Sequence, residues 1–191
     1  MDLVLIRHPA VGIDAGICYG RTDVPLRANA AESARLLSER LQTLKVPDAS
    51  GGLYTSPLSR CRLLAEALGP VHASDARLQE LDFGAWEGQR WDGLDRAMLD
   101  AWAADLEHAR EHGGESVAQF AKRVAGWADS VCTADHEGPV HVITHAGVMR
   151  VMTGHLLGIA RANVIQWPLD FGAIVWLRRA RGQWLLVRWN A

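Results

Sequence analysis

The chain begins with an uninterrupted run of apolar side chains, residues 3–6, which ends at Arg7 and His8. A short run that is apolar at every position predicts a strand buried on both faces, because a half-exposed strand alternates polar and apolar residues. Strands of this kind are typical of parallel sheets covered by helices on each side. The opening of the chain therefore favours an α/β architecture.

The rest of the chain alternates helical and strand-like patterns. Helices are predicted where apolar residues recur at spacings of three and four, over residues 29–44, 58–68, 91–112, 117–131 and 147–157. Strands are predicted over residues 53–55, 140–144, 173–177 and 184–189, and residues 77–83 are irregular. Together these elements predict a three-layer α/β/α sandwich with a mainly parallel, mixed central sheet and a helical insertion.

Local signals mark several of these boundaries. Ser56 followed by Pro57 is typical of an N-cap and first helical position. Ser116 with Gln119 three residues later fits a capping box. The polar segment 178–183 predicts a turn whose arginines are solvated at a hairpin tip.

We find no internal repeat, low-complexity segment or linker, and we predict a single domain over residues 1–191. A domain of this length buries roughly 70% of its unfolded surface. The helical stretch at about 91–134 is interpreted as an insertion within that domain, because its own core would be thin.

Composition excludes several classes of protein. With 20 basic and 22 acidic residues the net charge is −2, which argues against binding nucleic acid through bulk positive charge. The longest stretch without a charged side chain, 138–149, is shorter than the about 20 residues that span a membrane. No secretory signal is visible, and the three cysteines are widely spaced, so we expect reduced thiols in a cytoplasmic protein.

Ligands of open α/β sheets bind beyond the carboxyl ends of the strands. Three predicted strands end in polar residues there: one at Arg7 and His8, one in a segment that reaches Arg60, and one at His145. A single histidine at a strand end is more often structural than catalytic. The coincidence at three strand ends is what predicts a site.

Arginine and histidine side chains in this arrangement are suited to binding a single phosphate group. The planar fork of arginine matches phosphate oxygens, and the helices that start near Ser56 and Gly147 offer free backbone N–H groups. A neutral histidine nitrogen can attack phosphorus, and a second histidine, if protonated, can donate to the developing negative charge. With these cations present, no metal or other cofactor is expected.

Four segments carry a specific resemblance. Residues 5–8, 55–60, 78–88 and 144–147 resemble, in order, the four motifs of the histidine phosphatase superfamily, also called phosphoglycerate-mutase-like. Residues 18–26 resemble a segment of the α-ribazole phosphatases of cobalamin synthesis. The resemblance implies a metal-independent phosphomonoesterase that hydrolyses α-ribazole 5′-phosphate, a small phosphorylated metabolite.

Alternatives within the resemblance are a broader phosphatase of sugar phosphates or nucleotides, a phosphoglycerate mutase, and an inactive phosphoryl-binding module. The oligomeric state, monomer or homodimer, is left open.

By the same resemblance, His8 is the nucleophile that becomes a phosphohistidine. Arg7 and Arg60 then bind the phosphoryl oxygens, and His145 completes the phosphate pocket. Backbone groups of Ala146 and Gly147 are further candidate donors.

Glu80 matches the acid that protonates the leaving oxygen and then activates water. Glu87 is its rival, and Asp82 is a weaker one.

The first motif departs from the family pattern. The family continues with a glycine after the histidine and later an asparagine that touches the phosphate, whereas this chain has Pro9 and no asparagine at that distance. Proline also lacks a backbone N–H. Arg21 and Thr22 are the candidates to replace the asparagine.

Two further signals concern the surroundings of the site. Trp86 and Trp91 follow the acid motif and are candidates to stack on a flat leaving group. Residues 108–112 fit an inverted zinc motif on a helix. Its polar surroundings and the lack of a third ligand argue against a metal site.

Overall fold

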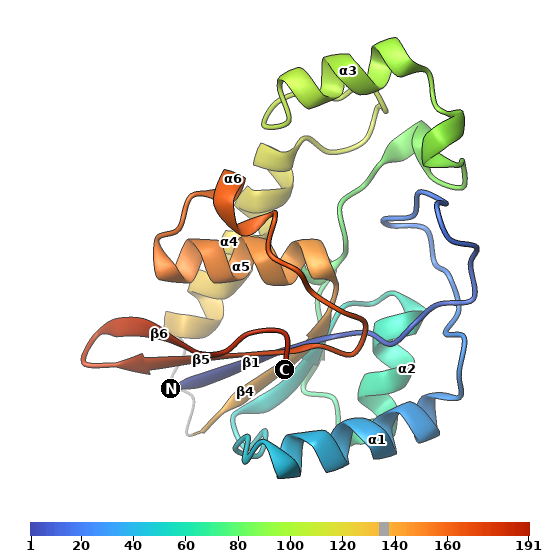
Figure 1. Ribbon diagram of the computed structural model, residues 1–191. Coiled ribbons are helices and arrows are strands. Elements are labelled where there is room, and N and C mark those ends of the chain that lie inside the picture. Colours follow the sequence, from blue (N-terminus) through green and yellow to red (C-terminus); the bar gives the residue numbers. More distant parts are fainter. Residues whose placement is uncertain (134–137) are drawn as a thin grey trace.

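A six-stranded sheet forms the centre of the computed structural model, which describes residues 1–133 and 138–191 (Figure 1). The strands are β1 (Asp2–Arg7), β2 (Gly52–Thr55), β3 (Ala73–Ser74), β4 (Val140–Thr144), β5 (Ile174–Ala180) and β6 (Gln183–Arg188). Their order is β3-β2-β4-β1-β5-β6. Pairing is parallel from β3 to β1, and β5 is antiparallel to both neighbours. The predicted mixed, mainly parallel sheet is confirmed.

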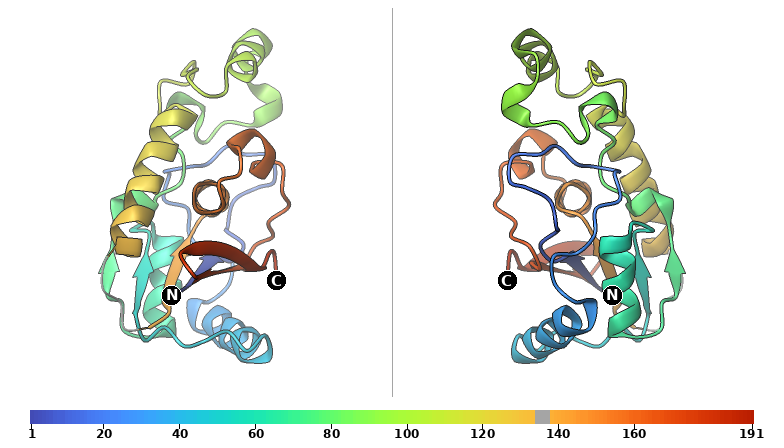
Figure 2. Two further views of the ribbon diagram at one scale, coloured as in Figure 1. Left: turned by 90° about the vertical axis from the view of Figure 1, so that its left-hand side faces the viewer. Right: turned by 90° about the vertical axis from the view of Figure 1, so that its right-hand side faces the viewer.

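Helices cover both faces of the sheet, which confirms the three layers (Figure 2). Helices α1 (Ala30–Thr43) and α2 (Ser59–Leu68) pack on one face, and α4 (Val117–Thr133) and α5 (Ala146–Leu157) pack on the other. Alternate residues of β1 enter the two separate cores, Leu3 and Leu5 on one side and Val4 and Ile6 on the other. All four are fully buried, which is why the opening run tolerates no polar residue.

The prediction of one continuous helix over 91–112 is wrong, because the observed helix is shorter. The structure has a 3-10 turn at Trp91–Gly93, helix α3 (Arg96–Ala104) and then irregular turns. Asp95 caps α3 by accepting from the Met98 N–H at 3.1 Å, and Asp105 accepts from the His108 N–H at 3.2 Å. Aspartates that take backbone donors in this way begin new turns and so interrupt a continuous helix.

The predicted helix starts had different outcomes. The Ser116–Gln119 capping box is confirmed, with reciprocal hydrogen bonds of 3.0 and 3.2 Å. Ser56, in contrast, does not cap α2. That helix begins at Ser59 with Leu58 as N-cap, and the Ser56 hydroxyl instead lies 2.9 Å from a ring nitrogen of His145.

Two strands extend into the predicted turn 178–183, which narrows to Arg181 and Gly182, both at positive φ. A short helix, α6 (Arg161–Val164), was not predicted.

The insertion shares the core of the main fold. Phe120, Val124 and Trp127 of α4 belong to the same buried cluster as β1, β4 and α5. The single domain over 1–191 stays a prediction, and the last residue of the predicted insertion, Ala134, lies outside the described residues. Within the described ranges, no helix has the length and apolar character needed to cross a membrane.

Candidate active site

The carboxyl ends of three neighbouring parallel strands assemble the site. Arg7 of β1 is in register with Thr144 of β4, and Thr55 of β2 is in register with Ile143 of β4. The residues that follow these strands therefore meet at one edge. The rings of His8 and His145 lie 5.2 Å apart, centroid to centroid.

His8 is buried and held in a defined tautomer. Its Nδ1 lies 2.7 Å from the carbonyl oxygen of Pro9. A carbonyl can only accept, so Nδ1 carries the proton and Nε2 keeps its lone pair. Burial and the charges of Arg60 and Arg7 lower the pKa of His8 to about 3, although the Pro9 hydrogen bond opposes this change. His8 is thus a neutral imidazole with a free Nε2, which is the form a nucleophile needs.

Arg60 is fully buried and held by the loop that follows the first strand. Its Nη1 donates to the Thr22 carbonyl at 2.8 Å and its Nη2 donates to the Gly20 carbonyl at 2.6 Å. Its Nε donates to Nδ1 of His145 at 3.3 Å. Because a guanidinium has five N–H donors, each terminal nitrogen keeps one for a ligand.

His145 is neutral as well. Its Nδ1 accepts from Arg60, so the ring proton is on Nε2, which lies 2.9 Å from the Ser56 hydroxyl. Burial, together with the charges of Arg60 and His8, holds the pKa of His145 well below its ordinary value. An imidazolium at this position, which the sequence suggested, is therefore disfavoured. The ring instead orients Arg60.

Arg7 has a buried hydrogen-bond donor that is suited to binding an anion. Its Nη1 donates to the Leu169 carbonyl at 2.5 Å, and its guanidinium carbon lies 3.9 Å from the centroid of the Phe171 ring. Its Nε is buried without a partner among the described residues. An unsatisfied buried donor is costly, so a phosphoryl oxygen is a natural partner for it.

Glu80 and Glu87 differ sharply in their surroundings. Glu80 borders the cavity next to His8, where its two oxygens accept from the N–H groups of Gly147 and Leu81, each at 3.0 Å. Glu87 borders neither of the cavities described below.

Glu87 accepts from the N–H groups of Arg21, Thr22 and Phe83 and from the Thr22 hydroxyl. Burial raises the pKa of Glu87, but these bonds outweigh it and lower the pKa overall. Glu87 is therefore an anchor of the loop, and the geometry favours Glu80 as the acid.

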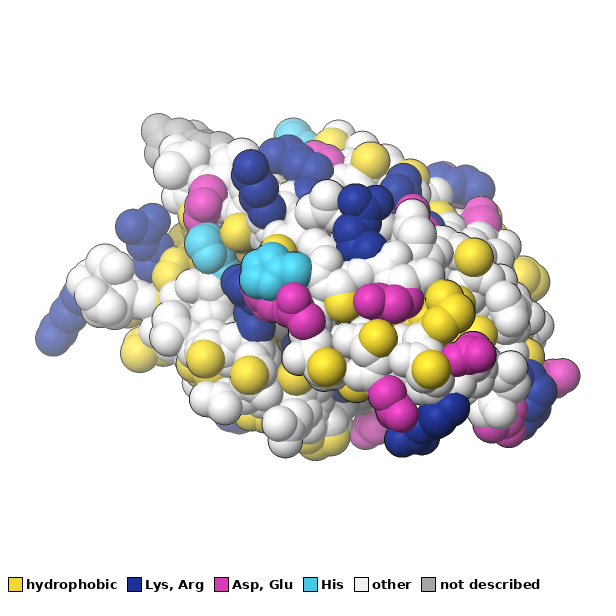
Figure 3. Space-filling model, turned by 90° about the horizontal axis from the view of Figure 1, so that it is seen from above, with side chains coloured by type: hydrophobic (Ala, Val, Ile, Leu, Met, Phe, Trp, Pro, Cys, Tyr) yellow, Lys and Arg dark blue, Asp and Glu magenta, His cyan; other side chains and the backbone are white. Residues whose placement is uncertain are grey.

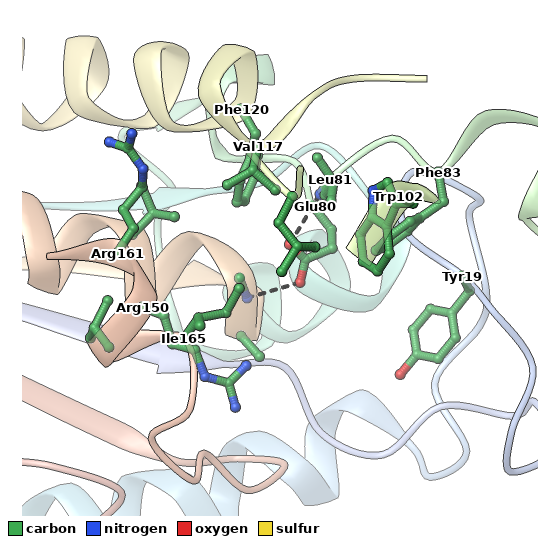
Figure 4. A pocket seen from close by; sticks show the side chains of 15 residues that line it. Tyr19, Glu80, Leu81, Phe83, Trp102, Val117, Phe120, Arg150, Arg161 and Ile165 are labelled. Carbon is green, nitrogen blue, oxygen red and sulfur yellow. Dashed lines mark hydrogen bonds between the residues drawn. The ribbon is translucent and has the colours of Figure 1, made fainter. Parts of the chain in front are cut away.

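Two adjoining cavities share lining residues at this site, and Figure 4 shows the lining of the apolar one. The phosphate cavity, of about 390 Å³, is lined by Arg7, His8, Ile17, Tyr19, Arg60, Glu80, Trp91 and Arg150. The apolar cavity, of about 240 Å³, is lined mainly by hydrophobic side chains, among them Phe83, Trp102, Phe120, Val117 and Ile165. The two cavities share Tyr19, Glu80 and Arg150.

Comparison with known proteins identifies the family. The model of the histidine phosphatase superfamily (branch 1) matches residues 3–191. The chain belongs to this superfamily. It is a phosphomonoesterase of that family, as its motifs predicted.

Several relatives of this histidine phosphatase carry different names. It is 30% identical to a glucosyl-3-phosphoglycerate phosphatase of Mycolicibacterium vanbaalenii, over 99% of this chain and 94% of the relative. It is 28% identical to the adenosylcobalamin/alpha-ribazole phosphatase of Escherichia coli, over 90% of this chain and 87% of the relative. The crystal structure of the alpha-ribazole phosphatase from Shigella flexneri has a TM-score of 0.87 at 25% identity, and covers 100% of this chain and 96% of that one.

Other predicted site residues of the phosphatase lie outside the two cavities. The guanidinium of Arg21 faces Gln79 at 3.1 Å and Asp82 at 3.5 Å, and the Thr22 hydroxyl faces Glu87. Neither side chain lines the phosphate cavity. Their segment contributes through backbone carbonyls that hold Arg60.

The other predicted substrate-binding residues are Trp86, Ala146 and Gly147, and their contacts differ from those expected. Trp86 is only 3% exposed and packs against Trp91, Trp102 and His112, so it supports the wall of the site instead of lining it. Trp102, which the sequence did not single out, faces the apolar cavity. The Gly147 N–H is taken by Glu80, and Ala146 borders the apolar cavity.

The segment 108–112 of the phosphatase is not helical. His108 is exposed beside Asp105, whereas His112 is buried and its Nδ1 accepts from the Gly114 N–H at 3.0 Å. The two rings therefore do not share a helix face. Among the described residues, no group of three or more potential metal ligands is found.

Tyr19 and Arg150 border both cavities, and sequence reasoning predicted neither as a site residue. Arg150 follows Gly147 by three residues on α5, so helical spacing could have placed it on the same face. Tyr19 lies in the segment 18–26 that carries the α-ribazole phosphatase resemblance, but no local pattern predicts that its side chain borders the cavities. On the face seen over α3, basic and acidic side chains are interspersed, so that face carries no broad basic patch (Figure 3).

Proposed function

We propose that this histidine phosphatase hydrolyses α-ribazole 5′-phosphate to α-ribazole and phosphate through a phosphohistidine on His8. The observation that carries the proposal is the apolar cavity that opens directly beyond Glu80. The site thus combines cationic groups for one phosphate with an aromatic-walled space for the rest of the substrate.

The chemistry proceeds in two displacements at phosphorus. The free Nε2 of His8 attacks, the bond to the ester oxygen breaks, and protonated Glu80 supplies the proton to that oxygen. Water then attacks the phosphohistidine while ionised Glu80 takes its proton, which releases phosphate and neutral His8. Arg7 and Arg60 hold the phosphoryl oxygens through both steps, as fixed donors do for developing charge.

The walls of the apolar cavity favour a flat, weakly polar leaving group. Phe83, Trp102 and Phe120 present aromatic surface, which a benzimidazole base covers and a serine or glycerate does not. The named substrates of the relatives do not decide between these possibilities, because the relatives differ in name at nearly equal identity.

The direct test compares kcat/KM for α-ribazole 5′-phosphate with that for phosphoserine, 3-phosphoglycerate and common sugar phosphates. We expect a preference of at least about tenfold for α-ribazole 5′-phosphate, which equals about 1.4 kcal/mol of transition-state discrimination. Trp102→Ala should reduce this preference. A smaller preference in the unaltered enzyme would favour the broad-specificity phosphatase instead.

The cytoplasmic location stays a prediction. It accords with the three cysteines, all of which are free thiols in the structure.

A further inference from the structure

The junction of the two cavities contains one cation with unused donors. Tyr19, Glu80 and Arg150 border both cavities, and Figure 4 shows the Arg150 guanidinium and the Tyr19 hydroxyl facing the same opening beside Glu80. We propose that Arg150 donates a hydrogen bond to an oxygen of the leaving group, close to the ester oxygen, and so determines substrate specificity. The identity of that leaving group, a ribosyl unit, rests on the proposed function.

Helix α5 places Arg150 on the same side as the catalytic acid. The N–H of Gly147 holds Glu80 at 3.0 Å, and Arg150 follows by three residues, nearly one helical turn later. Its guanidinium is anchored by a hydrogen bond of 2.9 Å from Nε to the Trp167 carbonyl. The anchor orients the group but does not use its two terminal nitrogens.

Those terminal nitrogens are available to a ligand. In the described parts of the chain, neither has a protein hydrogen-bond acceptor, and no carboxylate lies within 4.0 Å. Burial lowers the pKa of Arg150, while the charge of Glu80 opposes that change. The group remains cationic at neutral pH because the ordinary pKa of arginine is so high. A half-buried guanidinium with free N–H groups favours a charge-assisted hydrogen bond.

The position of Glu80 locates the acceptor. The ester oxygen must lie beside Glu80 to receive its proton, so the next atoms of the leaving group pass Arg150 before they enter the apolar cavity. An oxygen on those atoms, either a ribosyl oxygen or a carboxylate oxygen, is the acceptor that the guanidinium matches. An unsubstituted aryl group has no such oxygen.

Arg161 provides a matched control. It also borders the apolar cavity, but its guanidinium is ion-paired with Glu107. Removing this second arginine changes the charge near the cavity without removing a free donor from the junction.

The experiment measures kcat/KM of Arg150→Met, Arg150→Lys and Arg161→Met with α-ribazole 5′-phosphate, 3-phosphoglycerate and phenyl phosphate. We expect Arg150→Met to lose about 10- to 100-fold on the substrate with the preferred leaving-group oxygen, the effect of one charge-assisted hydrogen bond. Phenyl phosphate should change by less than about threefold, since the phosphoryl contacts are intact. Inhibition by inorganic phosphate should be unchanged, and Arg161→Met should show no selective loss on the oxygen-bearing substrates relative to phenyl phosphate.

Arg150→Lys keeps the charge but not the planar fork, and it guards against misfolding caused by the unpaired Trp167 carbonyl. We expect it to lose several-fold on the oxygen-bearing substrate alone. Equal losses on phenyl phosphate, with weaker phosphate inhibition, would assign Arg150 to the phosphoryl group and overturn the proposal. Undiminished activity of both variants would overturn it as well.

The outcomes also separate this inference from the proposed function. If the unaltered enzyme prefers 3-phosphoglycerate, the proposed function fails. The loss in Arg150→Met relative to phenyl phosphate then shows whether Arg150 binds a carboxylate oxygen instead.

Discussion

Replacing each of the two rival glutamates by glutamine separates a catalytic acid from a structural anchor. In Glu80→Gln the side chain keeps its shape but cannot donate or accept the proton. General acid–base catalysis contributes about 10²- to 10⁴-fold, so kcat for an alkyl phosphate should fall by that factor. With p-nitrophenyl phosphate the first step needs no proton, so this variant should accumulate phosphohistidine.

The effect of Glu87→Gln follows from its hydrogen bonds. Glu87 accepts from three backbone N–H groups and one hydroxyl, shared equally between its two oxygens. Glutamine replaces one oxygen by an NH₂ group, so two donors lose their acceptor. At about 1 kcal/mol for each bond to this half-buried carboxylate, the unfolding free energy should fall by about 2 kcal/mol. For a chain of this length that lowers Tm by about 4–8 °C.

The assays are steady-state kinetics, rapid-quench trapping and thermal unfolding of both variants. We expect a large loss of kcat with a small change in Tm for Glu80→Gln, and the reverse for Glu87→Gln. If Glu87→Gln lost activity at unchanged Tm while Glu80→Gln stayed active, the assignment of the acid would be refuted.

Three further predictions concern the nucleophile and the metal. Rapid quench should trap acid-labile, base-stable phosphate on His8 and none in His8→Ala; an active enzyme that never yields it would contradict the covalent route. Because the pKa of His8 is about 3 when folded and about 6.5 when unfolded, its neutral form contributes stability above about pH 6.5. That contribution should disappear as the pH falls toward 3. Between pH 7 and pH 5, His8→Gln should therefore lose less unfolding free energy than the unaltered protein. Equal losses in the two proteins would count against a buried neutral ring. Hydrolysis of an aryl phosphate should persist in chelator, whereas loss of activity that zinc restores would revive the metal motif at 108–112.

Local sequence patterns are enough to predict a mixed, mainly parallel sheet and the edge of it where the chemistry lies. The apolar run of β1 required burial on both faces, and parallel strands always present their carboxyl ends at one edge. The meeting of His8, Arg60 and His145 follows from strand order and register, which these local patterns constrain. The motifs were sufficient to predict the family as well.

The roles of several site residues depend instead on partners far away in the chain. Glu80 differs from Glu87 because one faces the start of α5 and the other faces the loop at 21–22. Burial beside Arg60 decided that His145 is neutral. Trp102, and not Trp86, lines the apolar cavity, because the Trp86 ring is buried against Trp91, Trp102 and His112. Each outcome depends on contacts between segments far apart in the chain, and local spacing carries no information about such contacts.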